Sequence, residues 1–344
     1  MSENKPSVKM LDVAQEAGVS RATVSLAMRE SPRIPRATRQ RVRDAADRLG
    51  YVYDRRAARL RSGASNVIGL VITDNANLFF AEFAEAMEAT LRGSDHVMLL
   101  GITHDDIDRQ EAILRRLVED HVAGIVLVPA IGTTPEQVAA TVPSSIRLVI
   151  ATRPLGGPEV GYVGTDSDVG GALAAQHLLE HGCRTLAFFG GLDQSSTRRT
   201  RAAGFNAEVV AVGATIAPSW NVASQPGAQA AYDLAVEILT RAEPPDGIAC
   251  NSDPIAYGLM RALADHGFEV GSRVKVIGFD DLPHSALWRP SLTSVRADSG
   301  TLGRWAAESV VGIGQPPHGG LHRPGLTARE SCGCGLERVR DWHD

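Results

Sequence analysis

The chain predicts an α/β protein with a small three-helix head and a long body of alternating strands and helices. Three observations support this fold class. Apolar residues between positions 12 and 28 have helical spacing that is broken once, at Gly18. From residue 65 onward, short apolar runs typical of buried strands alternate with helical segments, and the whole pattern occurs twice. The length of 344 residues, 44% of them hydrophobic, suits two or three domains with sizeable cores.

Residues 12–28, with the sequence DVAQEAGVSRATVSLAM, indicate a helix-turn-helix. Gly18 can adopt the left-handed conformation that ends a first helix, and Ser20 can cap a second one. The second helix then directs Ser20, Arg21, Thr23 and Ser25 outward. Short hydroxyls with one arginine suit contacts to DNA phosphates and base edges. The alternative is an ordinary helical hairpin within a core.

A third helix is expected over residues 36–49, ending at Gly50, with five arginines on the face opposite its apolar residues. The charge of the chain is correspondingly uneven. Residues 1–63 carry 14 Lys and Arg against 7 Asp and Glu, a net charge of +7, whereas the remainder carries 21 against 33, a net charge of −12. A basic head on an acidic body is typical of a DNA-binding module joined to a sensor.

The body reads as two successive parallel α/β units. We expect strands at residues 67–72, 97–101, 124–129, 148–152, 186–191, 248–253 and 274–281. We expect helices at residues 83–91, 109–118, 170–179, 228–239 and 255–264. Two such sheets leave a cleft between them, and ligands bind at the carboxyl ends of parallel strands.

Several classes of protein are disfavoured by the sequence. No run of about 18 apolar residues and no apolar signal region occur, so we expect a cytoplasmic protein without a membrane partner. The four cysteines, Cys183, Cys250, Cys332 and Cys334, indicate reduced thiols. A metal site at the C-x-C pair would need further ligands, and none are close in sequence, so no metal is expected. The chain has three lysines, none in a phosphate-binding loop, and no catalytic constellation, so we expect neither an enzyme nor a cofactor.

Four segments together resemble the LacI/GalR family of bacterial transcription repressors: residues 12–25, 49–51, 57–61 and 68–71. The resemblance covers roughly residues 9–332 and implies a periplasmic-binding-protein-like body of two subdomains. The implied division is a DNA-binding domain at 1–53, a hinge helix and linker at 54–64, and an effector-binding body at 65–344. Its N-subdomain comprises 65–165 and 297–325, and its C-subdomain 166–296 and 326–334. Within the family, three segments look most similar to the maltose-regulon repressor branch: residues 24–28, 151–153 and 195–205.

The resemblance also implies a DNA-contacting set: Ser20, Arg21, Ala22, Thr23, Ser25, Leu26, Arg39, Tyr51, Ala57 and Leu60. Arg21 and Ala22 take the positions that read bases in the major groove, and Leu60 takes that of an apolar wedge in the minor groove. We expect Leu60→Ala to weaken operator binding strongly and to leave effector binding intact. Three positions depart from the common pattern: Lys9 replaces a hydroxyl residue that caps the first helix, Leu26 replaces a base-reading arginine, and Asp54 replaces an asparagine.

The ligand-binding set implied by the resemblance, together with nearby aromatic residues, is Asn77, Phe79, Phe80, Thr152, Arg201, Ser252, Asp253, Asp280 and Trp288. Arg201 would grip ligand hydroxyls or a carboxylate with its planar fork, and Asp280 would accept from hydroxyls. Asp253 has a second interpretation as a helix cap, and the aromatic residues as ordinary core. Thr152 and Ser252 stand where many sugar-binding relatives have Asp and Asn, which reduces the hydrogen-bonding capacity for a simple hexose.

The expected function is therefore that of a homodimeric repressor that binds near-palindromic operator DNA under the control of a sugar-like small molecule. Two alternatives stay open: a regulator activated by a corepressor, and a solute-binding protein without DNA function. After Cys334 the remaining residues are too few for a heptad-based tetramerisation helix.

Overall fold

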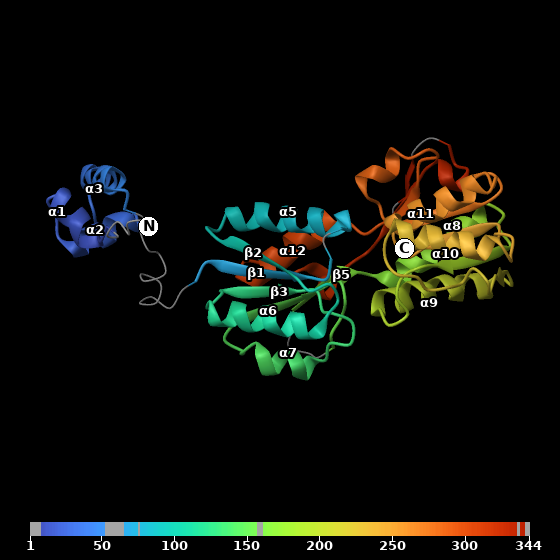
Figure 1. The fold of residues 1–344 in the computed structure, drawn as a ribbon, viewed down its shortest axis with the longest axis horizontal. Coiled ribbons are helices and arrows are strands. Elements are labelled where there is room, and N and C mark those ends of the chain that lie inside the picture. The colour runs from blue at the N-terminus through green and yellow to red at the C-terminus, as the bar shows by residue number, and fades with distance from the viewer. Residues whose placement is uncertain (1–7, 52–64, 75, 157–160, 336–337, 341–344) are drawn as a thin grey trace, which may run out of the picture. The chain divides into compact units, whose positions relative to one another are not determined.

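The computed structural model describes residues 8–51, 65–74, 76–156, 161–335 and 338–340. The chain divides into two compact units, a head at residues 1–65 and a body at 66–344. Each unit is described by itself below. In Figure 1 the head carries the labels α1 to α3, and the body carries the remaining labels.

The head is a three-helix unit built from α1 (Met10–Glu16), α2 (Arg21–Met28) and α3 (Arg36–Leu49). Gly18 has a φ of 64°, which is the left-handed turn expected between the first two helices, and Gly50 ends α3 with a φ of 67°. The helices enclose a small apolar core that contains Val13, Val24 and Val42. The helical spacing of the apolar residues therefore produces a packed helix-turn-helix.

The first lobe of the body contains a six-stranded sheet in the order β11-β5-β4-β3-β1-β2, whose pairs are all parallel. Its strands are β1 (Val67–Ile72), β2 (Val97–Ile102), β3 (Gly124–Leu127), β4 (Arg147–Ala151), β5 (Gly161–Thr165) and β11 (Leu321–His322). Its helices are α5 (Leu78–Arg92), α6 (Ile107–Glu119), α7 (Pro135–Thr141), α12 (Ser299–Val311) and the short η2 (Pro317–Gly320). Leu70 packs with α5 and α12, whereas its neighbour Val71 packs with α6 and α7, because successive side chains of a strand face opposite sides.

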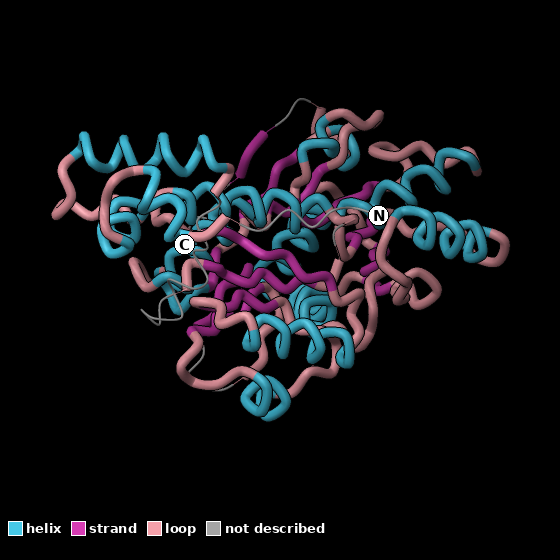
Figure 2. Tube along the Cα trace, turned by 60° about the vertical axis from the view of Figure 1, so that its left-hand side comes forward, coloured by secondary structure: helices cyan, strands magenta, loops and turns pink. Residues whose placement is uncertain are grey.

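The second lobe contains a seven-stranded sheet in the order β13-β12-β10-β9-β8-β6-β7. Its strands are β6 (Thr185–Phe189), β7 (Thr215–Ile216), β8 (Gly247–Cys250), β9 (Lys275–Asp280), β10 (Thr293–Arg296), β12 (Gly325–Ala328) and β13 (Arg338–Arg340). Its helices are α8 (Ser167–Glu180), α9 (Ser196–Ala211), α10 (Ala228–Leu239), α11 (Asp253–Asp265), η1 (Pro283–Ala286) and η3 (Glu330–Cys332). Phe188 packs with α8 and α9, and Phe189 with α10 and α11. The helices of the body thus run along the outside of the strands, as Figure 2 shows.

The chain passes between the two sheets three times. It leaves the first sheet after β5, returns after β10, and leaves again between β11 and β12. The residues at these passages are Asp166, which caps α8, Ala297 with Asp298, and Arg323 with Pro324. These connections place the carboxyl ends of both sets of parallel strands around one cleft within the body.

The α/β fold class is confirmed, with a helix-turn-helix and a body of two subdomains whose sheets are largely parallel. The structure adds elements that the periodicity did not predict, namely α7, α9, α12, β5, β7 and the strands after residue 292. The helix expected at residues 83–91 begins earlier, at Leu78, because Asn77 caps it by accepting from the Phe79 backbone N–H at 3.0 Å. Among the described residues, no helix is both long and apolar enough to span a bilayer.

Candidate DNA-binding face and effector cleft

The outer face of α2 presents the residues expected to contact DNA. Ser20 caps the helix through its Oγ, which accepts from the Thr23 backbone N–H at 3.1 Å and lies 2.9 Å from the Thr23 Oγ1. Arg21 and Ala22 are exposed, and Ser25 and Leu26 are half-buried. The cap therefore fixes the start of α2 and leaves the Arg21 guanidinium free to extend from its first turn.

The structure gives particular contacts for three further residues of the head, Arg39, Tyr51 and Lys9. The Arg39 guanidinium donates to the Glu30 carbonyl at 2.9 Å, so this side chain ties α3 to the loop after α2. Tyr51 packs partly against the head core. Lys9 precedes α1 without a side-chain cap, and its backbone N–H donates to the Asp12 carboxylate at 2.8 Å instead. Asp54, Ala57 and Leu60 lie outside the described residues.

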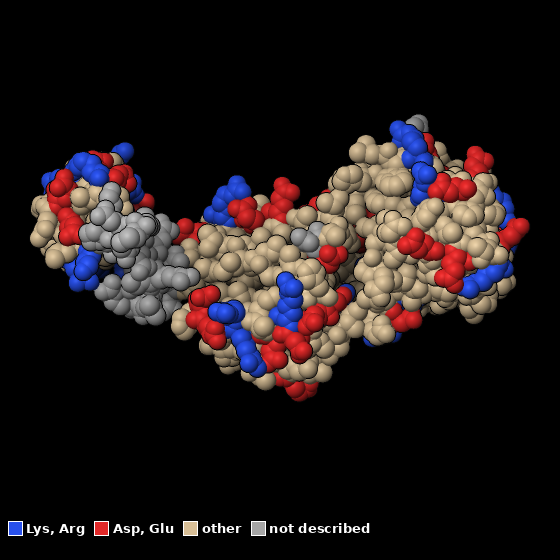
Figure 3. Space-filling view, in the orientation of Figure 1, with Lys and Arg blue, Asp and Glu red and all other residues tan. Residues whose placement is uncertain are grey.

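The surface of the body is mixed in charge on the face shown in Figure 3, where Lys and Arg alternate with Asp and Glu. Several charged side chains of the body pair along helices at a spacing of four residues, such as Arg92 with Glu88 on α5 and Arg261 with Asp265 on α11. The described part of the head carries nine Lys and Arg against five Asp and Glu. Residues 64–344 carry 21 Lys and Arg against 33 Asp and Glu, so the head is the candidate surface for the DNA backbone.

The cleft of the body is lined from both lobes. Among the residues expected to bind a ligand, seven line it: Asn77, Phe79, Phe80, Thr152, Arg201, Ser252 and Asp280. The structure adds polar residues that sequence reasoning did not single out: Thr73, Asp74, Asp105, Arg153, Thr165, Ser167, Ser195, Thr197 and Asn251. Most of these follow the carboxyl ends of strands, and that position is the signal that could have revealed them.

Arg201 projects into the cleft from the second turn of α9. Its Nη1 donates to the Asn251 carbonyl at 2.6 Å, and its guanidinium carbon lies 3.5 Å from the centre of the Phe279 ring. Burial lowers the pKa of Arg201 to about 10, against the opposing effect of Asp280, so the group stays charged at neutral pH. Its Nε and the nearby Asn251 Oδ1 are buried without hydrogen-bond partners among the described residues. Each of these side chains therefore keeps one unused hydrogen-bonding group next to the cleft.

Asp280 is the last residue of β9 and is almost completely buried. Its carboxylate accepts from the Asn77 Nδ2 at 3.1 Å, which links the two lobes across the cleft. Burial raises the pKa of Asp280 to about 6, and Arg201 opposes this rise. Its backbone φ of 118° is unusual for a residue with a side chain. Strain of this kind clusters at ligand-binding positions.

Arg153 and Asp105 form a two-pronged ion pair in the first lobe of the cleft. The Arg153 Nη2 donates to the Asp105 Oδ2 at 3.0 Å, and its Nη1 donates to the other carboxylate oxygen and to the Pro129 carbonyl at 3.1 Å. Because the two charges cancel, this pair gives the cleft hydrogen-bonding groups in fixed directions but adds no net charge to it. Thr152, the preceding residue, has a φ of 59° and turns the chain into the cleft.

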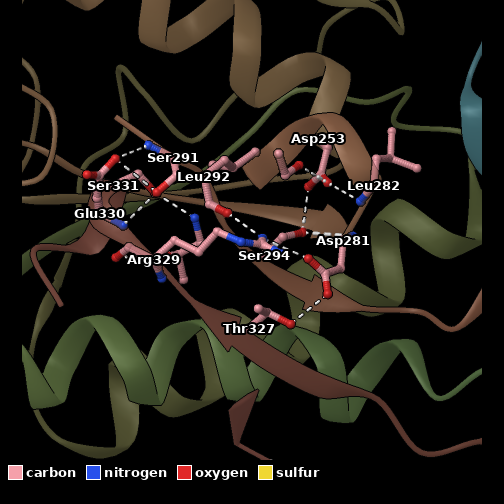
Figure 4. A network of polar contacts seen from close by, with 12 residues as sticks. Asp253, Asp281, Leu282, Ser291, Leu292, Ser294, Thr327, Arg329, Glu330 and Ser331 are labelled. Carbon is pink, nitrogen blue, oxygen red and sulfur yellow. Dashed lines mark hydrogen bonds and ion pairs between the residues drawn. The ribbon is translucent and has the colours of Figure 1, made fainter. Parts of the chain in front are cut away.

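Two expected ligand-binding residues are not part of the cleft lining. Asp253 is fully buried and accepts from the Ser294 hydroxyl at 2.5 Å, the Ser285 hydroxyl at 2.6 Å and the Leu282 backbone N–H at 2.8 Å (Figure 4). It therefore holds β9, β10 and η1 together beneath the cleft, and burial raises its pKa to about 8. Trp288 stacks on Tyr257, with ring centres 4.8 Å apart, and neither residue lines the cleft.

A second part of this network continues through β12 to η3. Asp281, next to Asp280, receives the Thr327 hydroxyl at 2.6 Å and pairs with Arg329 at 2.8 Å, and its backbone N–H donates to Ser294 at 3.0 Å. Figure 4 shows this chain of contacts running from Asp253 to Glu330 and Ser331. The floor of the cleft and the segment after β12 are thus parts of one buried polar network.

The helix-turn-helix head and the two-lobed body with a polar cleft define a DNA-binding regulator with a built-in sensor domain. Residues 9–54 match the family described as "Bacterial regulatory proteins, lacI family", and residues 175–332 match the "Periplasmic binding protein-like domain". The chain is 31% identical over 301 residues to the HTH-type transcriptional regulator GntR of Pseudomonas aeruginosa, covering 87% of both chains. It belongs to the LacI family of bacterial transcriptional regulators.

Other relatives share this architecture. The chain is 26% identical to the HTH-type transcriptional repressor PurR of Photobacterium profundum, over 86% of this chain and 89% of the relative. It is 27% identical to the catabolite control protein A of Priestia megaterium, over 84% and 87% of the two chains. The structure of the Lac repressor dimer bound to operator and an anti-inducer superposes with a TM-score of 0.81 at 20% identity, covering 95% of this chain and 99% of that one.

Proposed function

We propose that this protein is a transcriptional repressor whose affinity for a near-palindromic operator is controlled by a neutral, polyhydroxylated small molecule, a sugar or sugar derivative, bound in the cleft. The observation that carries the proposal is that Arg201 and Asp280, a charged donor and a carboxylate from two elements of the second lobe, both line the polar cleft. Such a regulator acts on the bacterial nucleoid in the cytoplasm.

The charge of the cleft supports a neutral ligand over a phosphorylated one. Three carboxylates, Asp74, Asp105 and Asp280, face two guanidinium groups, Arg153 and Arg201. Arg153 is already neutralised by Asp105. The remaining Arg201 and Asp280 suit the donor and acceptor capacity of neighbouring hydroxyls. Phe79 and Phe80, at right angles with ring centres 5.3 Å apart, supply an apolar wall for the face of a sugar ring.

Two of the similar solved structures are complexes with sugars. The transcriptional regulator CelR in complex with cellobiose is 27% identical, with a TM-score of 0.69 over 94% of this chain and 99% of that one. A LacI-type regulator from Alkaliphilus metalliredigens in complex with D-xylulofuranose is 24% identical, with a TM-score of 0.67 over 78% of this chain. Thr152 and Ser252 have less hydrogen-bonding capacity than the Asp and Asn that the family resemblance implies at these positions, so we propose the sugar class and not a particular sugar.

The DNA-reading residues are proposed on the exposed face of α2. Arg21 would make a bidentate contact to a guanine, which typically contributes about 1–3 kcal/mol of discrimination. Ser20, Thr23 and Ser25 would contact phosphates together with Arg39 and Tyr51, and Ala22 and Leu26 would contact base edges. Ala57 and Leu60 keep their proposed roles in a hinge that wedges the operator centre.

Self-association is proposed through the exposed edge of the first sheet. β2 is an edge strand, and Val97, Leu99 and Leu100 are each about half exposed, with fractions of 55%, 47% and 48%. Apolar side chains on an unpaired edge are typical of an interface. A two-fold dimer would present two heads to the two halves of an operator.

The proposal is tested by a thermal-shift screen of the full chain against sugars, polyols, sugar acids and sugar phosphates, followed by operator binding with and without the hit. A ligand specific to the folded state stabilises it by about 2.7 kcal/mol at 100 times its dissociation constant. We expect a neutral sugar to raise the melting temperature and to weaken operator binding. A hit that strengthens operator binding would establish the corepressor alternative, and a hit restricted to sugar phosphates would contradict the proposed ligand class.

A further inference from the structure

Four potential metal ligands from distant parts of the sequence meet at the C-terminal end of α8. They are His177 in the last turn of that helix, His181 at its C-cap, and Cys332 and Cys334 at and just after the end of η3. One ligand atom from each residue lies within 4.8 Å of the others. The sequence shows the C-x-C pair alone, because the two histidines precede it by more than 150 residues. The structure supplies the partners that the pair lacks.

The two histidines are arranged as helical metal ligands. They are four residues apart, on one face of the helix, with ring centres 4.3 Å apart. The His181 Nδ1 lies 2.8 Å from the His177 carbonyl, which can only accept, so Nδ1 carries the proton and Nε2 keeps its lone pair. That lone pair faces the Cys334 Sγ at 2.9 Å. A histidine that donates one N–H to a backbone carbonyl and offers the other nitrogen is the usual form of a metal ligand.

Glu330 and Ser331, the two residues before Cys332, belong to the network of Figure 4. The Ser331 hydroxyl donates to the Val276 carbonyl at 2.6 Å, and the Glu330 carboxylate accepts from the Ser291 backbone N–H at 2.7 Å. Gly333 has a φ of 84°, which turns the chain between the two thiols. The Thr293 hydroxyl donates to the Cys332 Sγ at 3.0 Å, a contact that also suits a thiolate.

We infer that these residues bind one zinc ion, or a divalent ion of similar chemistry, as a tetrahedral site with two cysteine and two histidine ligands. Zn–S bonds of about 2.3 Å and Zn–N bonds of about 2.0–2.1 Å require ligand atoms roughly 3.3–3.8 Å apart. The Cys334 Sγ already lies 3.6 Å from the His177 Nε2. Binding replaces the two thiol protons, which pass to solvent, and the resulting site has no net charge, as a largely buried position requires. The ion joins α8 to the end of η3.

The test uses full-length protein, reduced and stripped of metal with a chelator, and titrated with Co²⁺ alone. We expect one equivalent to produce intense tetrahedral ligand-field bands and a sulfur-to-cobalt charge-transfer band, and Zn²⁺ to abolish both by displacement. One equivalent of Zn²⁺ should also raise the melting temperature. Cys334→Ser and His181→Gln, at half-buried positions that tolerate substitution, should weaken binding by on the order of a hundredfold or more.

His266→Gln is the matched control, because His266 also ends a helix and its Nδ1 lies 2.9 Å from the Ala262 carbonyl. This variant should bind Co²⁺ like the parent chain. Three outcomes overturn the inference: no charge-transfer band with fully reduced protein, bands that persist equally in Cys334→Ser and His181→Gln, or a Cys332–Cys334 disulfide in place of metal uptake.

Discussion

Two contacts hold the Arg201 guanidinium in place: a hydrogen bond to the Asn251 carbonyl and the face of the Phe279 ring. A preorganised charged donor loses little freedom when a ligand arrives. We expect Arg201→Lys to raise the effector dissociation constant by roughly tenfold to a hundredfold, since a hydrogen bond to a charged group contributes about 1.5–3 kcal/mol. Isothermal titration calorimetry measures this change.

The matched control is Arg199→Lys on the same helix. Arg199 is exposed and donates to the Gln194 carbonyl at 2.6 Å, outside the cleft lining. Its variant should bind the effector like the parent chain. An unchanged dissociation constant in Arg201→Lys would remove Arg201 from the ligand site.

Asp280 makes effector binding depend on pH. Burial raises its pKa to about 6, and hydroxyl groups donate best to the ionised carboxylate. Below that pKa the free protein holds a proton that the ligand must displace. We therefore expect the effector dissociation constant to be constant above pH 7 and to rise about tenfold per unit below pH 6. Titrations between pH 5 and 8 measure the profile.

Asp280→Asn should bind the effector weakly at every pH and lose this dependence. It should also stabilise the ligand-free protein at pH 8. The raised pKa means that the folded state binds the proton more tightly than the unfolded chain. The ionised group therefore costs stability as the pH rises through about 6. A parent-like pH profile in Asp280→Asn would show that another group titrates.

At the scale of elements, α8 and α9 approach so closely that two glycines are required at their contact. A Cβ at Gly204 would lie 2.1 Å from the Asp168 carbonyl oxygen, and one at Gly171 would lie 1.9 Å from that of Arg201. Gly204→Ala must therefore separate the helices. We expect a loss of about 1–3 kcal/mol in the free energy of unfolding, measured by urea denaturation, and weaker effector binding because Arg201 moves.

Gly300→Ala on α12 is the control for this helix contact. Its Cβ would meet nothing closer than 3.8 Å, so the substitution should be neutral or slightly stabilising. Parent-like stability in Gly204→Ala would mean that the helices can separate without cost.

The sequence predicted the elements that carry a strong period and missed those that do not. The strands of β1 and β9 are continuous apolar runs and were expected almost residue for residue. α9 carries six polar or charged residues in its first ten, so its sequence lacks the apolar period that indicates a helix. The sequence predicts Asp253 and Trp288 in the cleft, but their neighbours in space, Ser294 and Tyr257, decide their positions. Such contacts depend on tertiary packing that periodicity does not encode.

For the whole molecule, the exposed edge strand β2 predicts how assembly and DNA binding are linked. We expect Leu99→Lys to shift the protein toward monomer and to weaken operator binding at nanomolar protein concentration, because a desolvated lysine disfavours an apolar interface. Analytical ultracentrifugation and fluorescence anisotropy measure the two effects. Effector affinity should be retained, since Leu99 does not line the cleft.

Val210→Lys is the control, because Val210 is 67% exposed on α9 and its substitution adds the same charge elsewhere. It should sediment like the parent chain. If Leu99→Lys also sediments like the parent, the chains associate through another surface.

α8 has one end at each of two sites. Ser167, its first residue, lines the cleft, and His177 and His181 stand at its other end, about 15–20 Å away at 1.5 Å per residue. A rigid helix of this kind couples effector binding at one end to zinc binding at the other. Whatever factor zinc imposes on effector affinity, the effector must impose on zinc affinity. The zinc concentration in the cell would then change the sugar concentration at which this regulator responds.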